Sequence, residues 1–179
     1  MMHQEGNFMY ATNDTYSTVS LPYGNGAYCM TVLLPNEGKS ISDMLQVLDA
    51  KAFSSIYNNA KECVVDLKLP RFTTEVELSL NNIIAKLGAP SMFNGSADFS
   101  KLANGNFLVS KILQKAKIEV NEKGTKAAAV TAAIMTMSLY DPEEPEHVNF
   151  HADRPFVYVI SERSSGAIFF IGQFTGDEL

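Results

Sequence analysis

Residues 122–131, Glu-Lys-Gly-Thr-Lys-Ala-Ala-Ala-Val-Thr, are the stretch that decides which fold this chain has. Alanine has the highest intrinsic helix propensity, so composition alone predicts a helix here. Two features oppose a helix: Val130 and Thr131 are β-branched, and no large side chain between Lys126 and Val130 offers a packing anchor. Composition and side-chain shape therefore point to different structures.

A period of two explains the same segment better, because successive side chains of an extended chain point to opposite faces. One face would then carry only uncharged and mostly small side chains: Thr125, Ala127, Ala129, Thr131, Ala133 and Met135. Lys126, the only charge between Thr125 and Tyr140, falls on the other face. The segment is therefore predicted to be a strand that can enter a sheet without a clash or a buried charge.

The remaining residues predict a mixture of short strands and short helices, and so an α+β fold. Alternation and turn residues predict strands that end near Leu21 and that cover 27–34, 62–69, 72–76, the end of 107–120, 148–150, 156–160 and 168–174. Gly24-Asn25-Gly26 is expected to join the first two as a hairpin. Helices are expected after a cap at Ser40 or Ser42, after Asp49, and over 78–87 with Gly88 as its end. Phe169 and Phe170 are expected to be packed.

Length and charge restrict the classes of partner. The chain has 179 residues, which predicts one domain, and no apolar run approaches the ~20 residues of a membrane-spanning helix. Its 14 Lys+Arg and 20 Asp+Glu give a net charge of −6, which argues against nucleic acid as a partner. Cys29 and Cys63 are too few for a disulfide framework; we expect two buried free thiols, with a single bridge as the alternative.

The three histidines do not predict a metal or catalytic centre. His147 and His151 are four residues apart, but Pro145 and the expected strand remove the helical geometry that would bring them together on one metal ion. His3 has no neighbour in sequence with which it would pair. No arrangement of Ser, His and an acid has a specific spacing, so the sequence predicts no enzyme and no cofactor, with His147 and His151 as surface histidines.

Four stretches together resemble one known family. Residues 122–131 are similar to the hinge of the serpins, the serine protease inhibitors, and 150–160 (Phe-His-Ala-Asp-Arg-Pro-Phe-Val-Tyr-Val-Ile) to the signature that follows their reactive loop. Residues 68–72 (Lys-Leu-Pro-Arg-Phe) match as well, as do Met92-Phe93 with 97–100. The resemblance runs in order over essentially the whole chain, 1–179.

The resemblance implies a serpin fold and inhibition of a serine protease as a suicide substrate. After cleavage the hinge would insert as a new strand in the central sheet and carry the acylated protease with it. Residues 121–147 would be the reactive-centre loop. The residues implied in hinge and insertion are Glu122, Gly124, Thr125, Ala127, Ala128, Ala129, Val130, Thr131 and Ala133. The family also implies a secreted or extracellular protein, although Met1 to Gly6 show no signal peptide.

Two positions of the cleaved bond stay open. Counting from Gly124 to the family's usual position places Ser138 before the bond and Leu139 after it. A loop shorter by one residue places Met137 before the bond and Ser138 after it, which we prefer because an unbranched apolar side chain fills an apolar pocket better. Either choice implies elastase-, chymotrypsin- or subtilisin-like targets, because neither offers the Arg or Lys that a trypsin-like pocket binds.

The chain departs from the family in length, because a complete serpin is about twice as long. The resemblance places it in the C-terminal half, so the slot for the hinge would lie between 107–120 and a strand that this chain does not contain. We therefore expect no inhibition by the chain alone; its partners would be the N-terminal half or a neighbouring chain that pairs with it as a strand. The alternative is a non-inhibitory binding or strand-pairing assembly module.

Overall fold

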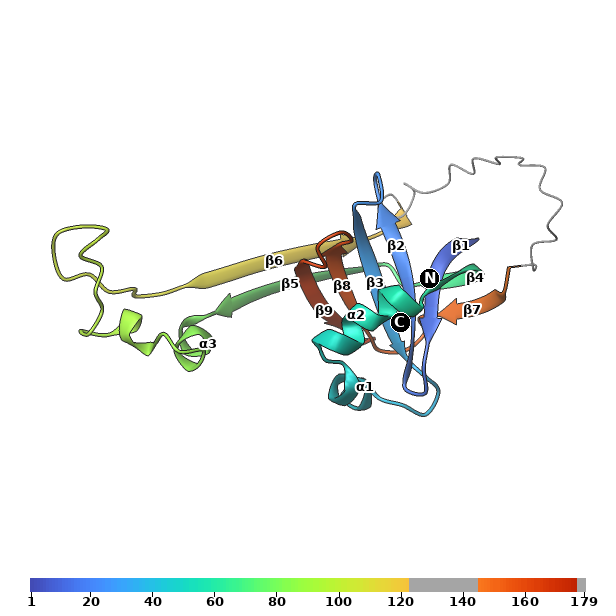
Figure 1. The fold of residues 1–179 in the computed structure, drawn as a ribbon, viewed down its shortest axis with the longest axis horizontal. Helices are drawn as coiled ribbons and strands as arrows, with labels where there is room; N and C mark the ends of the chain where they lie inside the picture. Colours follow the sequence, from blue (N-terminus) through green and yellow to red (C-terminus); the bar gives the residue numbers. More distant parts are fainter. Residues whose placement is uncertain (123–144, 177–179) are drawn as a thin grey trace. The chain divides into compact units, whose positions relative to one another are not determined.

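The computed structural model describes residues 1–122 and 145–176. The chain forms two compact units, one of Met1–Phe72 with Val120–Leu179 and one of Thr73–Glu119. The first unit is built on a seven-stranded sheet with the order β7-β4-β1-β2-β3-β8-β9 (Figure 1). The bounds are β1 Met2–Thr12, β2 Tyr16–Tyr23, β3 Tyr28–Pro35, β4 Lys61–Leu69, β7 His147–His151, β8 Phe156–Glu162 and β9 Ile168–Phe174.

Most strands of this sheet lie where alternation and turn residues predict them. β2 and β3 form the expected antiparallel hairpin, which closes through Gly24 and Gly26 at φ of 51° and 82°. β4 buries Cys63, Val65 and Leu67 in alternation. Cys29 and Cys63 are both free and buried, which confirms the expectation for the thiols.

Two helices, α1 (Ile41–Val47) and α2 (Ala50–Asn59), begin at predicted caps. The Ser40 Oγ accepts a hydrogen bond from the Asp43 N–H at 3.1 Å, and the Asp43 carboxylate accepts one from the Ser40 N–H at 2.8 Å. The Asp49 carboxylate caps α2 by accepting from the Ala52 N–H at 2.6 Å. The helices contribute Met44, Phe53 and Ile56 to a core cluster with Tyr16, Leu33, Val157 and Val159.

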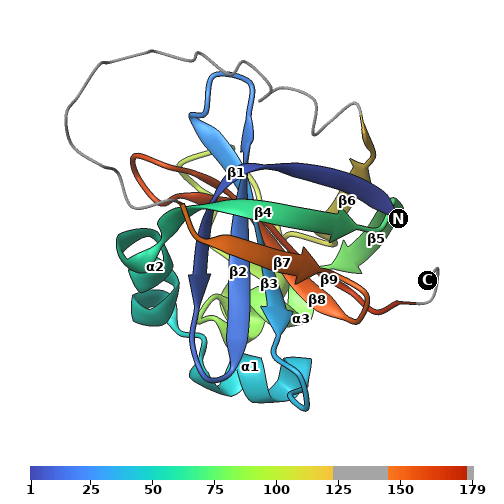
Figure 2. The same ribbon diagram turned by 90° about the vertical axis from the view of Figure 1, so that its right-hand side faces the viewer.

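Two features of the sheet differ from the sequence-based expectations. β1 is an eleven-residue strand that no alternation predicts; it forms because β2 and β4 both pair with it (Figure 2). Phe169 and Phe170 of β9 are 57% and 40% exposed, so they are not core residues as expected, although the Phe169 ring meets that of Tyr28 edge-on with centroids 5.6 Å apart. The reason is that β9 ends the strand order, with one neighbouring strand in the described chain.

The second unit contains a two-stranded sheet of β5 (Phe72–Ser79) and β6 (Leu113–Val120), with the helix α3 (Asn81–Lys86) and the 3-10 helix η1 (Pro90–Phe93). The helix predicted over 78–87 is shorter in the structure, where it covers only Asn81–Lys86. Its first residues instead continue β5, and the Leu80 N–H donates across to the Ile112 carbonyl at 2.9 Å. Gly88, at φ 111°, follows the helix as predicted.

Candidate functional site

The described residues include the beginning of the predicted hinge and the strand that follows the predicted reactive loop. Glu122 is the only predicted hinge residue among them. The other predicted site residues lie outside the described residues: Gly124, Thr125, Ala127, Ala128, Ala129, Val130, Thr131 and Ala133 of the hinge, and Met137, Ser138 and Leu139 of the cleaved bond. Their roles stay predictions.

Glu122 is held by an arginine from a distant part of the sequence. The Arg71 Nε donates to the Glu122 Oε1 at 2.6 Å, and the Arg71 Nη2 forms an ion pair with the same oxygen. The hydrogen bond from Arg71 is the main reason that the pKa of Glu122 lies below its usual value. Both side chains are largely exposed, so the pair orients the start of the predicted hinge more than it stabilises the fold.

The residue after Arg71 anchors this segment in the core. Phe72 is 4% exposed, and its ring centroid lies 5.8 Å from that of Phe156, 5.4 Å from that of Tyr158 and 5.1 Å from that of Phe174. Aromatic pairs at such distances contribute beyond their buried area. Phe72 therefore fixes the backbone from which Arg71 reaches Glu122.

Sequence reasoning did not find Arg71 as the partner of Glu122. The two residues are 51 positions apart, and no local periodicity connects them. The sequence did show that 68–72 and 122–131 resemble the same family. This resemblance places both stretches in one fold but does not predict that Arg71 contacts Glu122.

The strand after the predicted loop is fixed at both ends by β4. The Val64 N–H donates to the Glu146 carbonyl at 2.9 Å, and the Ala152 N–H donates to the Lys68 carbonyl at 2.8 Å. Between these bonds β7 pairs with β4 in parallel, whereas every other strand pair of the described large sheet is antiparallel. The last residues of the predicted loop, Glu146 and His147, are thus already attached to the sheet.

Two of the histidines meet one carboxylate beside this strand. The His3 Nε2 lies 2.6 Å from the Asp66 Oδ1, and the His151 Nε2 lies 3.1 Å from the Asp66 Oδ2. The expectation that His3 has no partner is therefore wrong, because the antiparallel pairing of β1 with β4 brings residues 63 positions apart together. The hydrogen bond with His151 is the main cause that lowers the pKa of Asp66.

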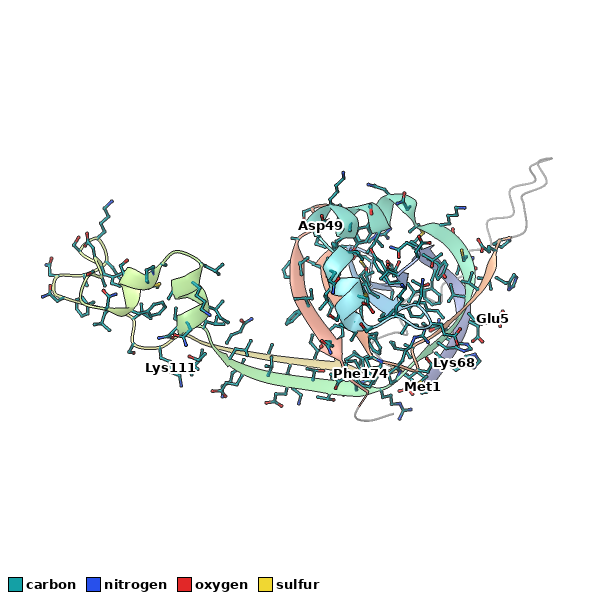
Figure 3. All side chains as sticks on the ribbon, turned by 90° about the horizontal axis from the view of Figure 1, so that it is seen from below. Met1, Glu5, Asp49, Lys68, Lys111 and Phe174 are labelled. Carbon is teal, nitrogen blue, oxygen red and sulfur yellow. The ribbon has the colours of Figure 1, made fainter. Side chains whose placement is uncertain are left out.

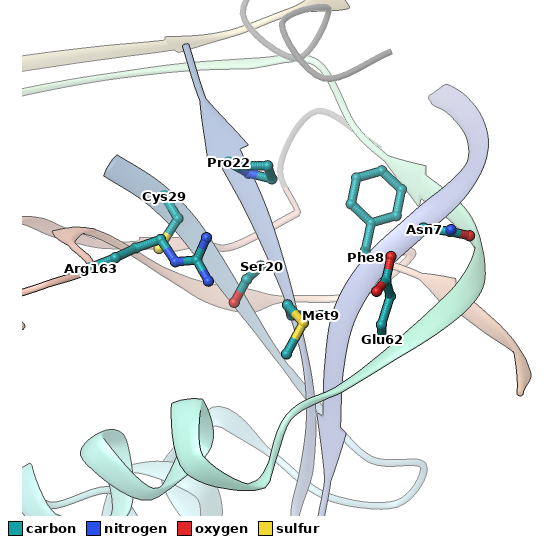
Figure 4. A pocket seen from close by; sticks show the side chains of 8 residues that line it. All are labelled: Asn7, Phe8, Met9, Ser20, Pro22, Cys29, Glu62 and Arg163. Atoms are coloured by element: carbon teal, nitrogen blue, oxygen red, sulfur yellow. The ribbon is translucent and has the colours of Figure 1, made fainter. Parts of the chain in front are cut away.

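A pocket of about 200 Å³ lies elsewhere in the first unit (Figure 4). Its lining residues are Asn7, Phe8, Met9, Ser20, Pro22, Cys29, Glu62 and Arg163. These residues include no histidine and offer no pairing of a nucleophile with a base. In the ranges 1–122 and 145–176, no three or more His, Cys, Asp or Glu gather as metal ligands, and no helix is long and apolar enough to span a membrane.

Comparison with known proteins gives one consistent family. The profile of the family described as Serpin (serine protease inhibitor) matches residues 1–176. Human leukocyte elastase inhibitor is 36% identical over 185 residues, which cover 98% of this chain and 48% of that protein. Bovine plasminogen activator inhibitor 1 is 35% identical over 181 residues, which cover 97% of this chain and 44% of that protein.

Solved structures give the same fold. The thermophilic serpin tengpin in its native state has a TM-score of 0.77 at 31% identity, over 97% of this chain and 45% of that one. Uncleaved ovalbumin has a TM-score of 0.80 at 24% identity, over 96% and 43%, which supports the fold alone. This chain spans less than half the length of these relatives. It belongs to the serpin family and has the α+β serpin fold.

Proposed function

We propose that this chain is the C-terminal part of a serpin domain and that the complete domain inhibits a serine protease as a suicide substrate. The observation that carries the proposal is the hinge pattern: Thr125, Ala127, Ala129, Thr131 and Ala133 form one uncharged face, in a chain that matches the serpin family from residue 1 to 176. Two relatives named as inhibitors, of leukocyte elastase and of plasminogen activator, support it.

In the proposed mechanism residues 121–147 are the bait. The protease serine attacks the carbonyl carbon before the cleaved bond, the peptide nitrogen leaves, and an ester joins loop and protease. The hinge then inserts as a strand beside β6, which has β5 as its one partner in the described two-stranded sheet. A small, uncharged inserting face makes insertion fast, so insertion precedes hydrolysis of the ester.

The proposed cleaved bond is Met137–Ser138, with Ser138–Leu139 as the alternative. Both suit apolar specificity pockets, so elastase-, chymotrypsin- and subtilisin-like proteases are the proposed targets. Secretion also stays a proposal, because it rests on the family resemblance alone.

The test is to incubate the chain, within a complete serpin domain, with elastase or chymotrypsin. We expect a covalent complex that survives SDS, and N-terminal sequencing of the released peptide should begin at Ser138, or at Leu139 for the alternative bond. Cleaved protein without any complex would refute the inhibitory function.

A matched pair of variants tests the period-two argument within the same assay. Ala129→Arg places a charge on the inserting face, and we expect it to convert the inhibitor into a substrate that is cleaved and released. Ala128→Arg places the same charge on the opposite face and should still form the complex. Equal behaviour of the two variants would contradict the assignment of the faces.

A second candidate function is a non-inhibitory module that pairs with another chain through a strand. The exposed apolar strand β9 favours this candidate, because an edge strand of this kind pairs readily. The chain of 179 residues alone should be cleaved by elastase without forming a complex under either proposal. The complete domain separates the two, since only an inhibitor traps the protease.

A further inference from the structure

β7 is an edge strand that buries one of its five side chains in the core. It has five residues and stands at the end of the strand order, with β4 as its neighbour in the described sheet. Phe150 is 1% exposed and is the one buried side chain of the five, whereas His147 and Asn149 are exposed. The strand is therefore held by its backbone hydrogen bonds and by Phe150, while its other face is largely exposed.

On the face of β7 opposite to Phe150, the side chain of Asp66 in β4 bonds the side chain of His151. In the strand register Lys68 of β4 lies opposite both His3 of β1 and His151 of β7, and Asp66 is two residues away on the same face. Each carboxylate oxygen bonds one imidazole, at 2.6 Å and 3.1 Å. One carboxylate thus connects three adjacent strands, which lie side by side in Figure 2.

Among the groups that face this cluster, Asp66 is the carboxylate that bonds both imidazoles. Lys68 faces the cluster from β4 and Glu5 faces it from β1, opposite Asp66; both are labelled in Figure 3. From β7, the neutral Asn149 lies opposite Asp66. Asp66 and His151 are each about one-third exposed, so water competes only partly for their hydrogen bond.

We propose that His3, Asp66 and His151 are positioning residues that hold β7 on the sheet and so fix the end of the reactive loop. The proposal rests on the inhibitory function proposed above, because β7 begins at His147, the last residue of the proposed loop 121–147. A loop whose end is held in place presents its bond to the protease in fewer orientations, which favours acylation.

Hydrogen exchange tests the structural part on the 179-residue chain. Asp66→Ala should raise amide exchange in peptides covering 146–152 by about tenfold, while the exchange of β8 stays unchanged. His151→Gln retains an N–H donor for Asp66 and should lose less of the protection than Asp66→Ala does. Glu5→Gln, on the opposite strand, is the control and should behave as wild type. Unchanged exchange of β7, or equally faster exchange in every strand, would overturn the positioning role.

Kinetics within a complete serpin domain test the functional part. Asp66→Ala should lower the rate constant of complex formation about three- to tenfold, and Glu5→Gln should not change it. If the wild-type domain forms no complex, the inhibitory function fails while the exchange experiment still decides whether the cluster holds β7. If Asp66→Ala loosens β7 but leaves the rate constant unchanged, the role in fixing the loop is refuted.

Discussion

At the scale of single residues, Gly172 of β9 is the position where side-chain size matters most. It lies opposite Tyr158 of β8, whose side chain is 1% exposed, and a Cβ at position 172 would overlap the Tyr158 ring. We expect Gly172→Ala to lower the free energy of unfolding by about 1–3 kcal/mol, the usual cost of overpacking. Urea denaturation of both proteins measures the difference. Gly95→Ala is the control, since nothing lies within 4 Å of a Cβ there; equal midpoints for wild type and Gly172→Ala would contradict the prediction.

At the scale of one element, Glu162 organises the turn between β8 and β9. Its carboxylate accepts hydrogen bonds from the Ser164 N–H at 3.0 Å and from the Ser165 N–H and Oγ at 2.7 Å and 2.5 Å. These bonds, the one from the Ser165 side chain first, lower the pKa of Glu162 from 4.5 to about 2. A lowered pKa means that the folded state prefers the charged carboxylate.

The sign of the pH dependence follows from this shift. The stabilisation by Glu162 is complete above the pKa of the unfolded chain and is lost as the pH falls from about 4.5 to about 2. We expect the free energy of unfolding to fall more steeply over this window in wild type than in Glu162→Gln. Urea titrations at several pH values measure both slopes. Parallel curves would show that the turn does not depend on the charge.

The α1 helix provides a second prediction for an element. Ser40→Ala removes the side chain that accepts from the Asp43 N–H, so we expect a loss of about 1 kcal/mol in the free energy of unfolding. Ser42→Ala is the matched control, because Ser42 was the other predicted cap and lies within the exposed face of the helix. Thermal or urea unfolding distinguishes them. A similar loss in both variants would mean that the cap is not the cause.

At the scale of the whole molecule, β9 presents an apolar edge. Ile168, Phe169, Phe170 and Ile171 are 52%, 57%, 40% and 64% exposed, and the strand carries no charge. Such a segment pairs with other chains unless a neighbour covers it. We expect Phe169→Lys with Ile171→Lys to reduce self-association of the 179-residue chain severalfold, measured by light scattering.

The control for this prediction uses apolar residues of similar exposure on a helix. Leu45 and Val47 of α1 are 51% and 50% exposed, so Leu45→Lys with Val47→Lys adds the same charge away from a strand edge. This variant should associate like wild type. If it reduces association as much as the β9 variant does, net charge and not the strand edge is responsible.

Local chemistry explains which elements were predictable. The caps of α1 and α2, the Gly24–Gly26 turn and the alternation of β4 each depend on side chains within a few residues, so the sequence shows them directly. β1 was not predictable because its residues lack an apolar alternation, and its strand conformation comes from pairing with β2 and β4. The prediction that the helix over 78–87 begins at Leu78 was wrong for a related reason. The Leu80 N–H bonds the Ile112 carbonyl across the strand pair, so the helix begins only after Leu80.

The sequence by itself determined the family and predicts the period-two hinge, because both depend on the order and size of neighbouring side chains. Only the tertiary structure decided that Arg71 holds Glu122 and that Asp66 bonds both His3 and His151. These partners are 51, 63 and 85 positions apart. Contacts over such distances depend on strand order and register, which no local pattern encodes.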